Sequence, residues 1–232
     1  MKKTFLTTNL IAHRGLHYNY LENTLGAFKE AIKNNYIIEL DVRLTKDKKV
    51  IVFHDNNLFR ITGINKNINE STYEELKEII NIPTLQEVLN LVSGKVPIII
   101  EIKLSKKLFQ LEKELSKFLN SYNYKFAIQS FNPLSILWFK INKPKYIRGY
   151  LINSIYSKNI IINRLLNSRI LNKILKPNYL GVNLQYLKNN KIKKLRRKYL
   201  IIGYTINNQE EYTEYKHYAD NFICNIGKEP YK

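Results

Sequence analysis

Short apolar runs alternate with amphipathic segments along most of the chain. Eight runs rich in Ile, Val, Leu or Tyr have the length of β-strands; they are Asn9 to Ala12, Ile37 to Leu44, Pro97 to Ile102, Phe126 to Gln129, Tyr146 to Leu151, Tyr179 to Asn183, Leu200 to Thr205 and Asn221 to Cys224. Between most of them, apolar residues recur at spacings of three and four, as in Leu25, Phe28, Ala31 and Ile32, which is typical of amphipathic helices. A strand followed by a helix, repeated eight times over 232 residues, predicts an α/β fold of the (β/α)8 TIM-barrel type.

An open doubly wound sheet would alternate in the same way. It usually carries a glycine-rich phosphate-binding loop after the first strand, and none follows Ala12. The chain has neither an internal repeat nor a linker, so we expect residues 1–232 to form a single barrel domain.

One segment interrupts the alternation of strands and helices. Only Thr45 to Lys49 separates the second predicted strand from the apolar run Val50 to Phe53. Five residues are too few for a parallel crossover, so these two runs are expected to form an antiparallel hairpin inserted after the second strand. With the turn centred between Asp47 and Lys48, this register places Asp41 opposite His54.

The composition is that of an ordinary folded protein, with 44% hydrophobic and 25% charged residues. The longest apolar runs are far shorter than the roughly 20 residues that span a bilayer. The segment after Met1 is interrupted by Thr7, Thr8 and Asn9, unlike a signal peptide. The one cysteine, Cys224, cannot form an internal disulfide. We therefore expect a cytoplasmic protein without a transmembrane segment.

The formal net charge is +19, from 38 basic and 19 acidic residues. The abundance of Ile, Asn, Lys and Tyr is typical of an A+T-rich genome, which is one explanation of the charge; the other is a field that attracts phosphoesters, lipid head groups or nucleic acid. The densest basic run, Lys188 to Lys198, has Ile192 and Leu195 at helical spacing. We interpret it as the solvated face of an amphipathic helix.

Polar residues gather where the first strands are predicted to end, which is the catalytic face of a barrel enzyme. They are His13, Arg14, Glu39, Asp41, His54, Asp55, Glu101, Lys103, Gln129 and Ser130. Residues two apart on a strand point to the same face, so Glu39 and Asp41 share a face, as do Glu101 and Lys103.

Three carboxylates in one barrel mouth would repel one another unless a cation neutralised them, and such oxygen ligands suit Mg²⁺ or Ca²⁺. The alternative is a structural network of Glu39 and Asp41 with Arg14, Arg43 or Lys103. His13 and His54 can each exchange protons near neutral pH. Arg14 offers a planar fork suited to phosphate, and Lys103 a point charge.

Seven short motifs follow one another along the first 131 residues. They are His13-Arg14-Gly15, Glu22-Asn23-Thr24, Glu39-Leu40-Asp41-Val42, Thr45-Lys46-Asp47, Val52-Phe53-His54-Asp55, Glu101-Ile102-Lys103 and Gln129-Ser130-Phe131. Each motif alone is weak, whereas seven in this order and spacing are specific. Together they resemble the ordered motifs of the glycerophosphodiester phosphodiesterases. The resemblance is close from Leu10 to Phe131 and looser beyond.

The resemblance implies a metal-dependent phosphodiesterase that hydrolyses glycerophosphodiesters, such as glycerophosphocholine or glycerophosphoethanolamine, to glycerol 3-phosphate and an alcohol. It also implies roles for individual residues: one divalent cation on Glu39, Asp41 and Glu101, acid and base catalysis by His13 and His54, phosphate binding by Arg14 and Lys103, and a place near the site for Glu22. The expected partner is a small-molecule substrate rather than nucleic acid.

The C-terminal third departs from the family pattern. Tyr204-Thr205-Ile206-Asn207 stands where the family usually has Trp-Thr-Val-Asn, so Tyr204 is expected to keep an aromatic wall of the substrate pocket. Cys224-Asn225 replaces the usual Thr-Asp, which leaves the closure of the barrel and the far wall of the pocket open. We expect Cys224 to be buried packing rather than a nucleophile.

Two other functions remain open at this point. A lysophospholipase D would need an apolar groove for an acyl chain, for which Tyr150, Leu151, Tyr186 and Tyr204 are candidate lining residues. A basic module that binds anions or nucleic acid without catalysis would show affinity that falls steeply with salt and survives the loss of His13.

Overall fold

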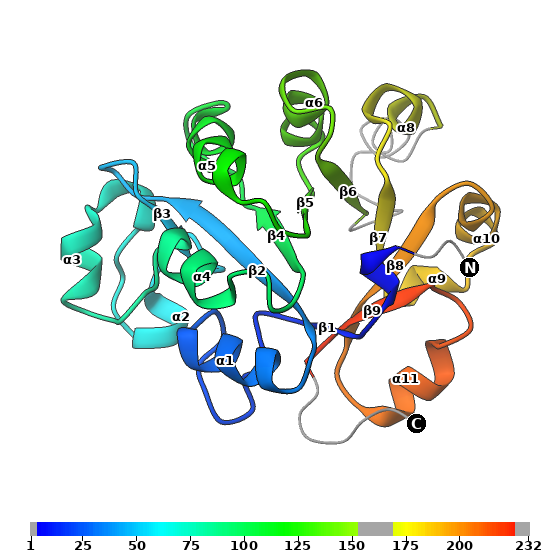
Figure 1. Ribbon diagram of the computed structural model, residues 1–232, viewed down its shortest axis with the longest axis horizontal. Helices are drawn as coiled ribbons and strands as arrows, with labels where there is room; N and C mark the ends of the chain where they lie inside the picture. Colours follow the sequence, from blue (N-terminus) through cyan, green and yellow to red (C-terminus); the bar gives the residue numbers. More distant parts are fainter. Residues whose placement is uncertain (1–3, 153–168, 226–232) are drawn as a thin grey trace.

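The eight predicted strands form a closed parallel barrel in the computed structural model, which describes residues 4–152 and 169–225 (Figure 1). The barrel strands are β1 (Ile11–Ala12), β2 (Ile37–Leu44), β4 (Ile98–Ile102), β5 (Phe126–Ser130), β6 (Ile147–Ile152), β7 (Tyr179–Asn183), β8 (Leu200–Ile206) and β9 (Asn221–Cys224). Their ends differ from the predicted ends by at most two residues. The (β/α)8 prediction is confirmed.

The first and last strands close the barrel. Within β1, Ile11 lies beside Ile37 of β2 on one side and Ile223 of β9 on the other. Ala12 is paired with Cys224, so the change to Cys224-Asn225 does not interrupt the closure. The Cys224 side chain is buried, as expected, and burial raises the pKa of its thiol.

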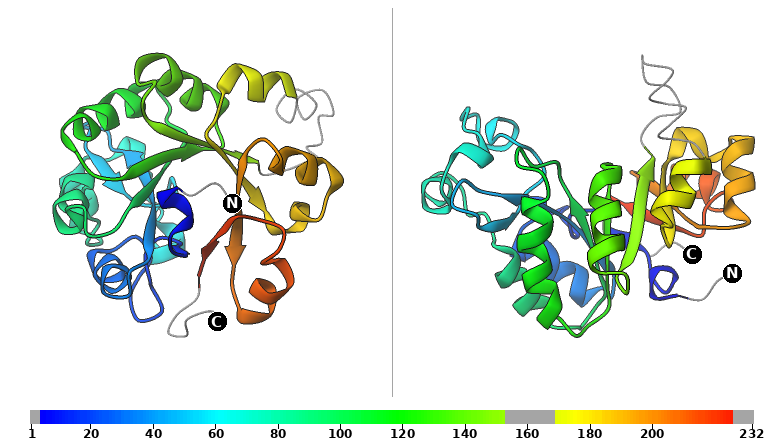
Figure 2. Two further views of the ribbon diagram at one scale, coloured as in Figure 1. Left: turned by 45° about the vertical axis from the view of Figure 1, so that its right-hand side comes forward. Right: turned by 90° about the horizontal axis from the view of Figure 1, so that it is seen from above.

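Helices surround the strands, as Figure 2 shows. They are α1 (Leu25–Lys33), α4 (Leu85–Val92), α5 (Gln110–Ser121), α6 (Pro133–Asn142), α8 (Arg169–Leu175), α9 (Leu184–Leu187), α10 (Asn190–Arg196) and α11 (Gln209–Tyr215), with a 3-10 turn η1 (Phe5–Thr7) before β1. Local signals start several of them: the Thr24 hydroxyl accepts from Ala27 N, and Thr84 and Glu87 form a capping box. Over the described ranges, none of the helices is long and apolar enough to cross a membrane.

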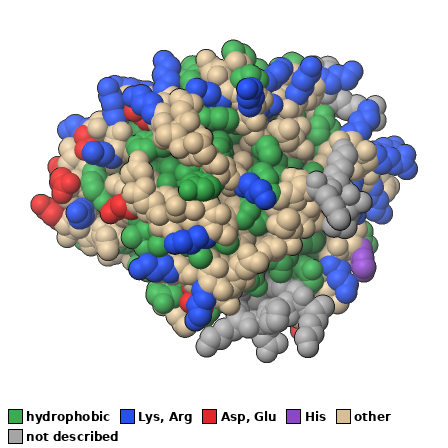
Figure 3. All heavy atoms as spheres, viewed as in Figure 1, with side chains coloured by type: hydrophobic (Ala, Val, Ile, Leu, Met, Phe, Trp, Pro, Cys, Tyr) green, Lys and Arg blue, Asp and Glu red, His purple; other side chains and the backbone are tan. Residues whose placement is uncertain are grey.

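The basic run Lys188 to Lys198 contains α10, as predicted, with Ile192 buried and its lysines exposed. On the face shown in Figure 3, Lys and Arg side chains spread mainly along the upper and right-hand edges, and most Asp and Glu side chains gather at the left. The positive charge on this face is therefore distributed over several elements.

Apolar side chains form a plug that fills the barrel near the amino-terminal ends of the strands. Ile37, Ile99 and Ala127 are fully buried and pack in one cluster with Tyr179. Because side chains alternate along a strand, the residues two positions further on point to the same side and lie one layer higher. Those residues are Glu39, Glu101 and Gln129, so the plug forms the floor of a polar site.

The hairpin after β2 is present, but its register differs by one residue from the prediction. Strand β3 (Val50–Val52) is antiparallel to β2, with Val42 opposite Val52. Phe53 N donates to Asp41 O, so Phe53 and not His54 lies opposite Asp41. The turn is centred on Asp47, because Lys48 takes a left-handed conformation (φ 65°) and Thr45 bonds to Lys49 across the turn.

The segment after β3 covers one side of the hairpin, at the left of Figure 1. It contains α2 (Phe59–Thr62), η2 (Ile68–Glu70) and α3 (Tyr73–Lys77). These elements bury a separate apolar cluster that includes Ile51, Leu58 and Leu76. The cluster holds the hairpin in place, and with it the His54 backbone that follows β3.

Candidate active site

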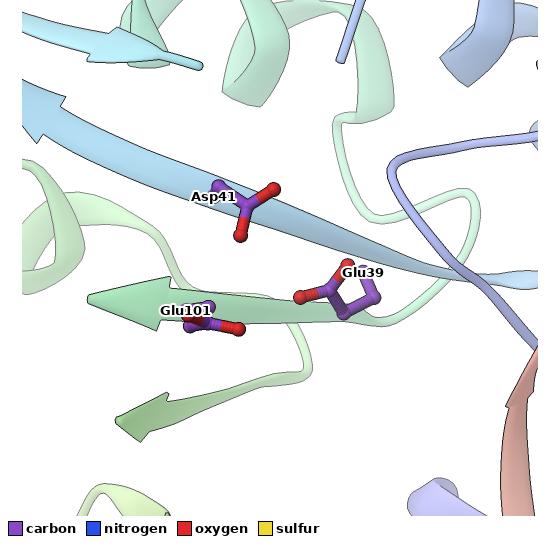
Figure 4. A group of neighbouring side chains, drawn as sticks. All are labelled: Glu39, Asp41 and Glu101. Atoms are coloured by element: carbon purple, nitrogen blue, oxygen red, sulfur yellow. The ribbon is translucent and has the colours of Figure 1, made fainter. Parts of the chain in front are cut away.

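Three carboxylates converge at the mouth end of neighbouring strands. In the parallel register of β2 and β4, Asp41 lies beside Glu101, and Glu39 is on the same face of β2. One oxygen from each of the three lies within 4.8 Å of the others, and all three side chains are buried (Figure 4). Strand alternation therefore brings together the predicted cation ligands.

Burial makes this group electrostatically costly. Burial and the nearby Asp41 charge raise the pKa of Glu39 well above its usual value, and the same causes raise the pKa of Glu101 to about 7. Burial also acts to raise the pKa of Asp41, but Lys103 and Arg14 outweigh it and hold that pKa well below its usual value. Three clustered buried carboxylates, two of them with raised pKa values, are a donor set that fits one hard divalent cation.

Two basic residues contact the carboxylates. Arg14 N donates to Glu39 at 3.2 Å, and its guanidinium Nε is 3.3 Å from an Asp41 oxygen. Lys103 Nζ is 2.9 Å from the other Asp41 oxygen and also forms an ion pair with Glu101. Both predicted phosphate-binding residues thus lie at the edge of the carboxylate group, where they neutralise part of its charge.

Glu22 connects the site to the hairpin segment. It accepts a hydrogen bond from Arg14 Nη1 at 2.7 Å and forms an ion pair with Arg60 of α2. Burial acts to raise the Glu22 pKa, but the Arg60 and Arg14 contacts lower it overall. Glu22 therefore stays ionised and orients Arg14, and Arg60, which the sequence interpretation did not include, is its second partner.

His13 is oriented by a chain of hydrogen bonds that runs through two asparagine residues. Its Nδ1 is 2.5 Å from Asn225 Oδ1, Asn225 Nδ2 donates to Asn207 Oδ1 at 2.7 Å, and Asn207 N donates to Glu211 at 2.7 Å. Because the Asn225 amide is oriented by Asn207, its oxygen faces His13 and accepts from Nδ1–H. The neutral tautomer then leaves the lone pair on Nε2. Burial, followed by the Arg14 charge, lowers the His13 pKa to about 4.

His54 has a carboxylate partner instead. Its Nδ1 is 2.6 Å from Asp55 Oδ1, and the other Asp55 oxygen accepts from Arg60 Nε at 2.5 Å. Burial lowers the His54 pKa, and the Lys103 and Arg14 charges act in the same direction, while the Asp41 charge and the hydrogen bond with Asp55 act against this shift. A charged partner at Nδ1 stabilises the imidazolium form, so the two histidines differ in the charge of the group that orients them.

Two supporting residues belong to the quoted motifs, but the sequence did not reveal what they do. The fully buried Asn23, in a left-handed conformation (φ 58°), donates to Asp41 Oδ2 at 2.8 Å and accepts from Asp41 N. Gln129 donates to Glu39 at 3.2 Å and accepts from Tyr179 Oη at 3.1 Å. The sequence shows that Asn23 belongs to a motif with Glu22. It gives no sign of the contact between Asn23 and Asp41, which lie 18 positions apart.

Tyr204 lies on the opposite wall. Its hydroxyl donates to Ile152 O at 2.8 Å, and its ring meets Phe131 edge-to-face at a centroid distance of 5.9 Å. Burial, together with the Glu101 charge, raises its pKa. The structure thus brings all the predicted site residues to one end of the barrel, with His13 and His54 both close enough to affect the Asp41 pKa.

Comparison with known proteins agrees with this geometry. A model of the glycerophosphoryl diester phosphodiesterase family matches residues 13–224. The chain belongs to this family. The solved structure of a glycerophosphodiester phosphodiesterase from Thermotoga maritima superimposes with a TM-score of 0.78 at 30% identity, covering 94% of each chain.

Curated relatives of the family match over shorter segments. A glycerophosphodiester phosphodiesterase from Bacillus altitudinis is 39% identical over 44% of this chain and 47% of its own length. A lysophospholipase D from Homo sapiens is 36% identical over 53% of this chain and 44% of its own length. The matched segments thus span about half the length of these relatives.

Proposed function

We propose that this family member is a metal-dependent phosphodiesterase that hydrolyses glycerophosphodiesters, such as glycerophosphocholine or glycerophosphoethanolamine, to glycerol 3-phosphate and an alcohol. The observation that carries the proposal is the buried group of Glu39, Asp41 and Glu101, with His13 and His54 close enough to affect the Asp41 pKa. We assign the reaction to one domain that includes the whole chain, since the family model spans most of it. A solved relative from Oleispira antarctica, 23% identical with a TM-score of 0.80, contains the product sn-glycerol-3-phosphate.

The charges of the site suit a phosphodiester monoanion. Cleavage increases the negative charge on the phosphoryl oxygens and on the departing alkoxide. In this proposal Arg14 and Lys103 bind the phosphoryl oxygens, and a bound Mg²⁺ or Ca²⁺ would supply further positive charge there. Glu22 keeps Arg14 oriented, and Tyr204 closes the far wall of the pocket.

We assign the base to His13 and the acid to His54. Because Nδ1–H of neutral His13 is bound to Asn225, its Nε2 can accept a proton from the attacking hydroxyl. That hydroxyl belongs either to water or to the glycerol 2-position of the substrate. Asp55 stabilises protonated His54, which donates its proton to the leaving oxygen. Each transfer typically contributes about 10² to 10⁴ in rate.

The test is turnover of a small panel of glycerophosphodiesters in Mg²⁺, in Ca²⁺ and in chelator. His13→Ala and His54→Ala should each lower turnover at least about a hundredfold without changing the melting temperature. A nitrophenyl phosphodiester, whose leaving group needs no proton, should rescue His54→Ala more than His13→Ala. Near wild-type rates in both variants would refute the catalytic pair.

A lysophospholipase D activity is the second candidate. It is favoured by the relatives that bear that name and by two exposed aliphatic side chains after β4, Leu104 and Leu108, which are 75% and 64% exposed. An acyl chain needs such apolar surface. Release of choline from lysophosphatidylcholine, compared with release from glycerophosphocholine, separates the two activities.

A further inference from the structure

A cavity of about 320 Å³ lies at the mouth end of β2 and β4, beside the candidate site. It is lined by Arg43, Leu44, Asn56, Ile68, Asn69, Leu104, Ser105 and Lys106. Its walls are the end of β2, the loop after β4, the turn η2 and the residue two positions after His54. Its volume is at the lower end of the range for small-molecule sites, about 300 to 1,000 Å³.

Arg43 connects this cavity to the catalytic group. It follows Glu39 and Asp41 at spacings of two along β2, so its side chain points to the same face. Its guanidinium Nε donates to His54 O at 2.7 Å, which fixes the guanidinium beside the histidine. Within residues 4–152 and 169–225, no carboxylate forms an ion pair with Arg43. A charged donor group is therefore held at the cavity wall.

Besides the aliphatic Leu44, Ile68 and Leu104, the other lining groups are donors and acceptors without a net negative charge. Asn56, Asn69 and Ser105 offer amide and hydroxyl groups, and the charge of Lys106 is matched by its ion pair with Glu70. No aromatic residue is among the lining residues. A trimethylammonium group is normally bound by aromatic faces or carboxylates, and this cavity offers it an arginine instead.

From these contacts we infer that the cavity is the subsite for the leaving alcohol, and that it selects an uncharged, hydroxyl-rich head group over a quaternary ammonium. The inference rests on the proposed phosphodiesterase function. In that reaction the bond between phosphorus and the head-group oxygen breaks, and the proton on His54 passes to that oxygen. The head group departs on the His54 side, where Arg43 and the amides can donate to its hydroxyl oxygens.

The neighbouring surface does not offer a better cation site. The hollow on the other side of Asn56 is lined by Asp55, Asn57, Phe59, Arg60 and Asn65. It has one aromatic ring, Phe59, and its one carboxylate is already bound by His54 and Arg60. Preference for a choline head group would indicate that this hollow, and not the Arg43 cavity, receives the alcohol.

The experiment compares kcat/KM for glycerophosphoglycerol and glycerophosphocholine at saturating Mg²⁺. The wild-type chain should prefer the glycerol head group about tenfold or more. Arg43→Gln should lower the ratio of kcat/KM for glycerophosphoglycerol to kcat/KM for glycerophosphocholine by about tenfold to a hundredfold, the usual effect of losing a charged hydrogen-bond donor to one of two substrates. Arg197→Gln, which removes the same charge from the exposed end of α10, is the matched control.

A second variant tests the same subsite if Arg43→Gln folds poorly. Asn69→Asp adds a carboxylate to the cavity and should shift selectivity towards glycerophosphocholine. An equal loss on both substrates in Arg43→Gln would show that Arg43 only holds His54, and would refute the subsite. Choline preference in the wild-type chain would refute the subsite alone, whereas no turnover of any glycerophosphodiester would refute the proposed function with it.

Discussion

The partner of His13 allows the assignment of base and acid to be tested by one substitution. Asn225→Asp would place a carboxylate where an amide oxygen now lies 2.5 Å from His13 Nδ1. Opposite charges about 4 Å apart attract by about 1 kcal/mol in water and about 4 kcal/mol at an effective dielectric constant of about 20. Asn225 is exposed, so we expect the lower part of this range, about 1 to 2 kcal/mol. That energy is about one pKa unit.

The direction of the effect follows from the role of the histidine. A base must be neutral, so activity is lost as the pH falls through its pKa, which lies at about 4 in the wild-type chain. Asn225→Asp should raise that pKa and move the acidic limb of the kcat/KM profile upward by about one pH unit. At pH 7 and above the rate should change little, apart from a small loss caused by breaking the contact with Asn207.

The assay is a kcat/KM profile from about pH 3 to 10 at saturating Mg²⁺ for both proteins. Asn189→Asp is the control, because it adds the same charge at the N-cap of α10, where Asp is as good a cap as Asn. If His13 were the acid, the alkaline limb would move upward instead. An acidic limb that stays in place or moves down would refute the contact between Asn225 and the base.

Three further predictions concern the metal group and its support. Asp41→Asn should weaken Mg²⁺ binding in calorimetry and lower turnover at least about a hundredfold with an unchanged circular dichroism spectrum; full wild-type activity in excess chelator would remove the cation from the account. Asn23→Ala should lower the free energy of unfolding in urea by about 1 to 3 kcal/mol, because a buried carboxylate loses its donor, and should reduce turnover; an unchanged urea midpoint would show that the contact is dispensable. Gly149→Ala should lower the melting temperature, at a cost of about 1 to 3 kcal/mol, because its Cβ would lie 2.1 Å from the Tyr179 ring; full stability would contradict this packing.

Alternating strands and helices determined the barrel directly from the sequence. The period of apolar residues depends on local geometry, so it is visible in a single chain. The same rule put Glu39 and Asp41 on one face of a strand and Glu101 and Lys103 on one face of another. The ordered motifs added the family, and the family model confirms it.

Tertiary structure decided which residues support the site. Its contacts join positions far apart in the chain: His13 with Asn225, Glu22 with Arg60, and Asn23 with Asp41. No periodicity records such pairs, because they depend on how strands close and loops fold. The hairpin shows the limit on a smaller scale, since one left-handed residue, Lys48, moved the register by one position and placed Phe53 opposite Asp41. Residue identity only biases the backbone conformation of a turn. That conformation determined the position of His54.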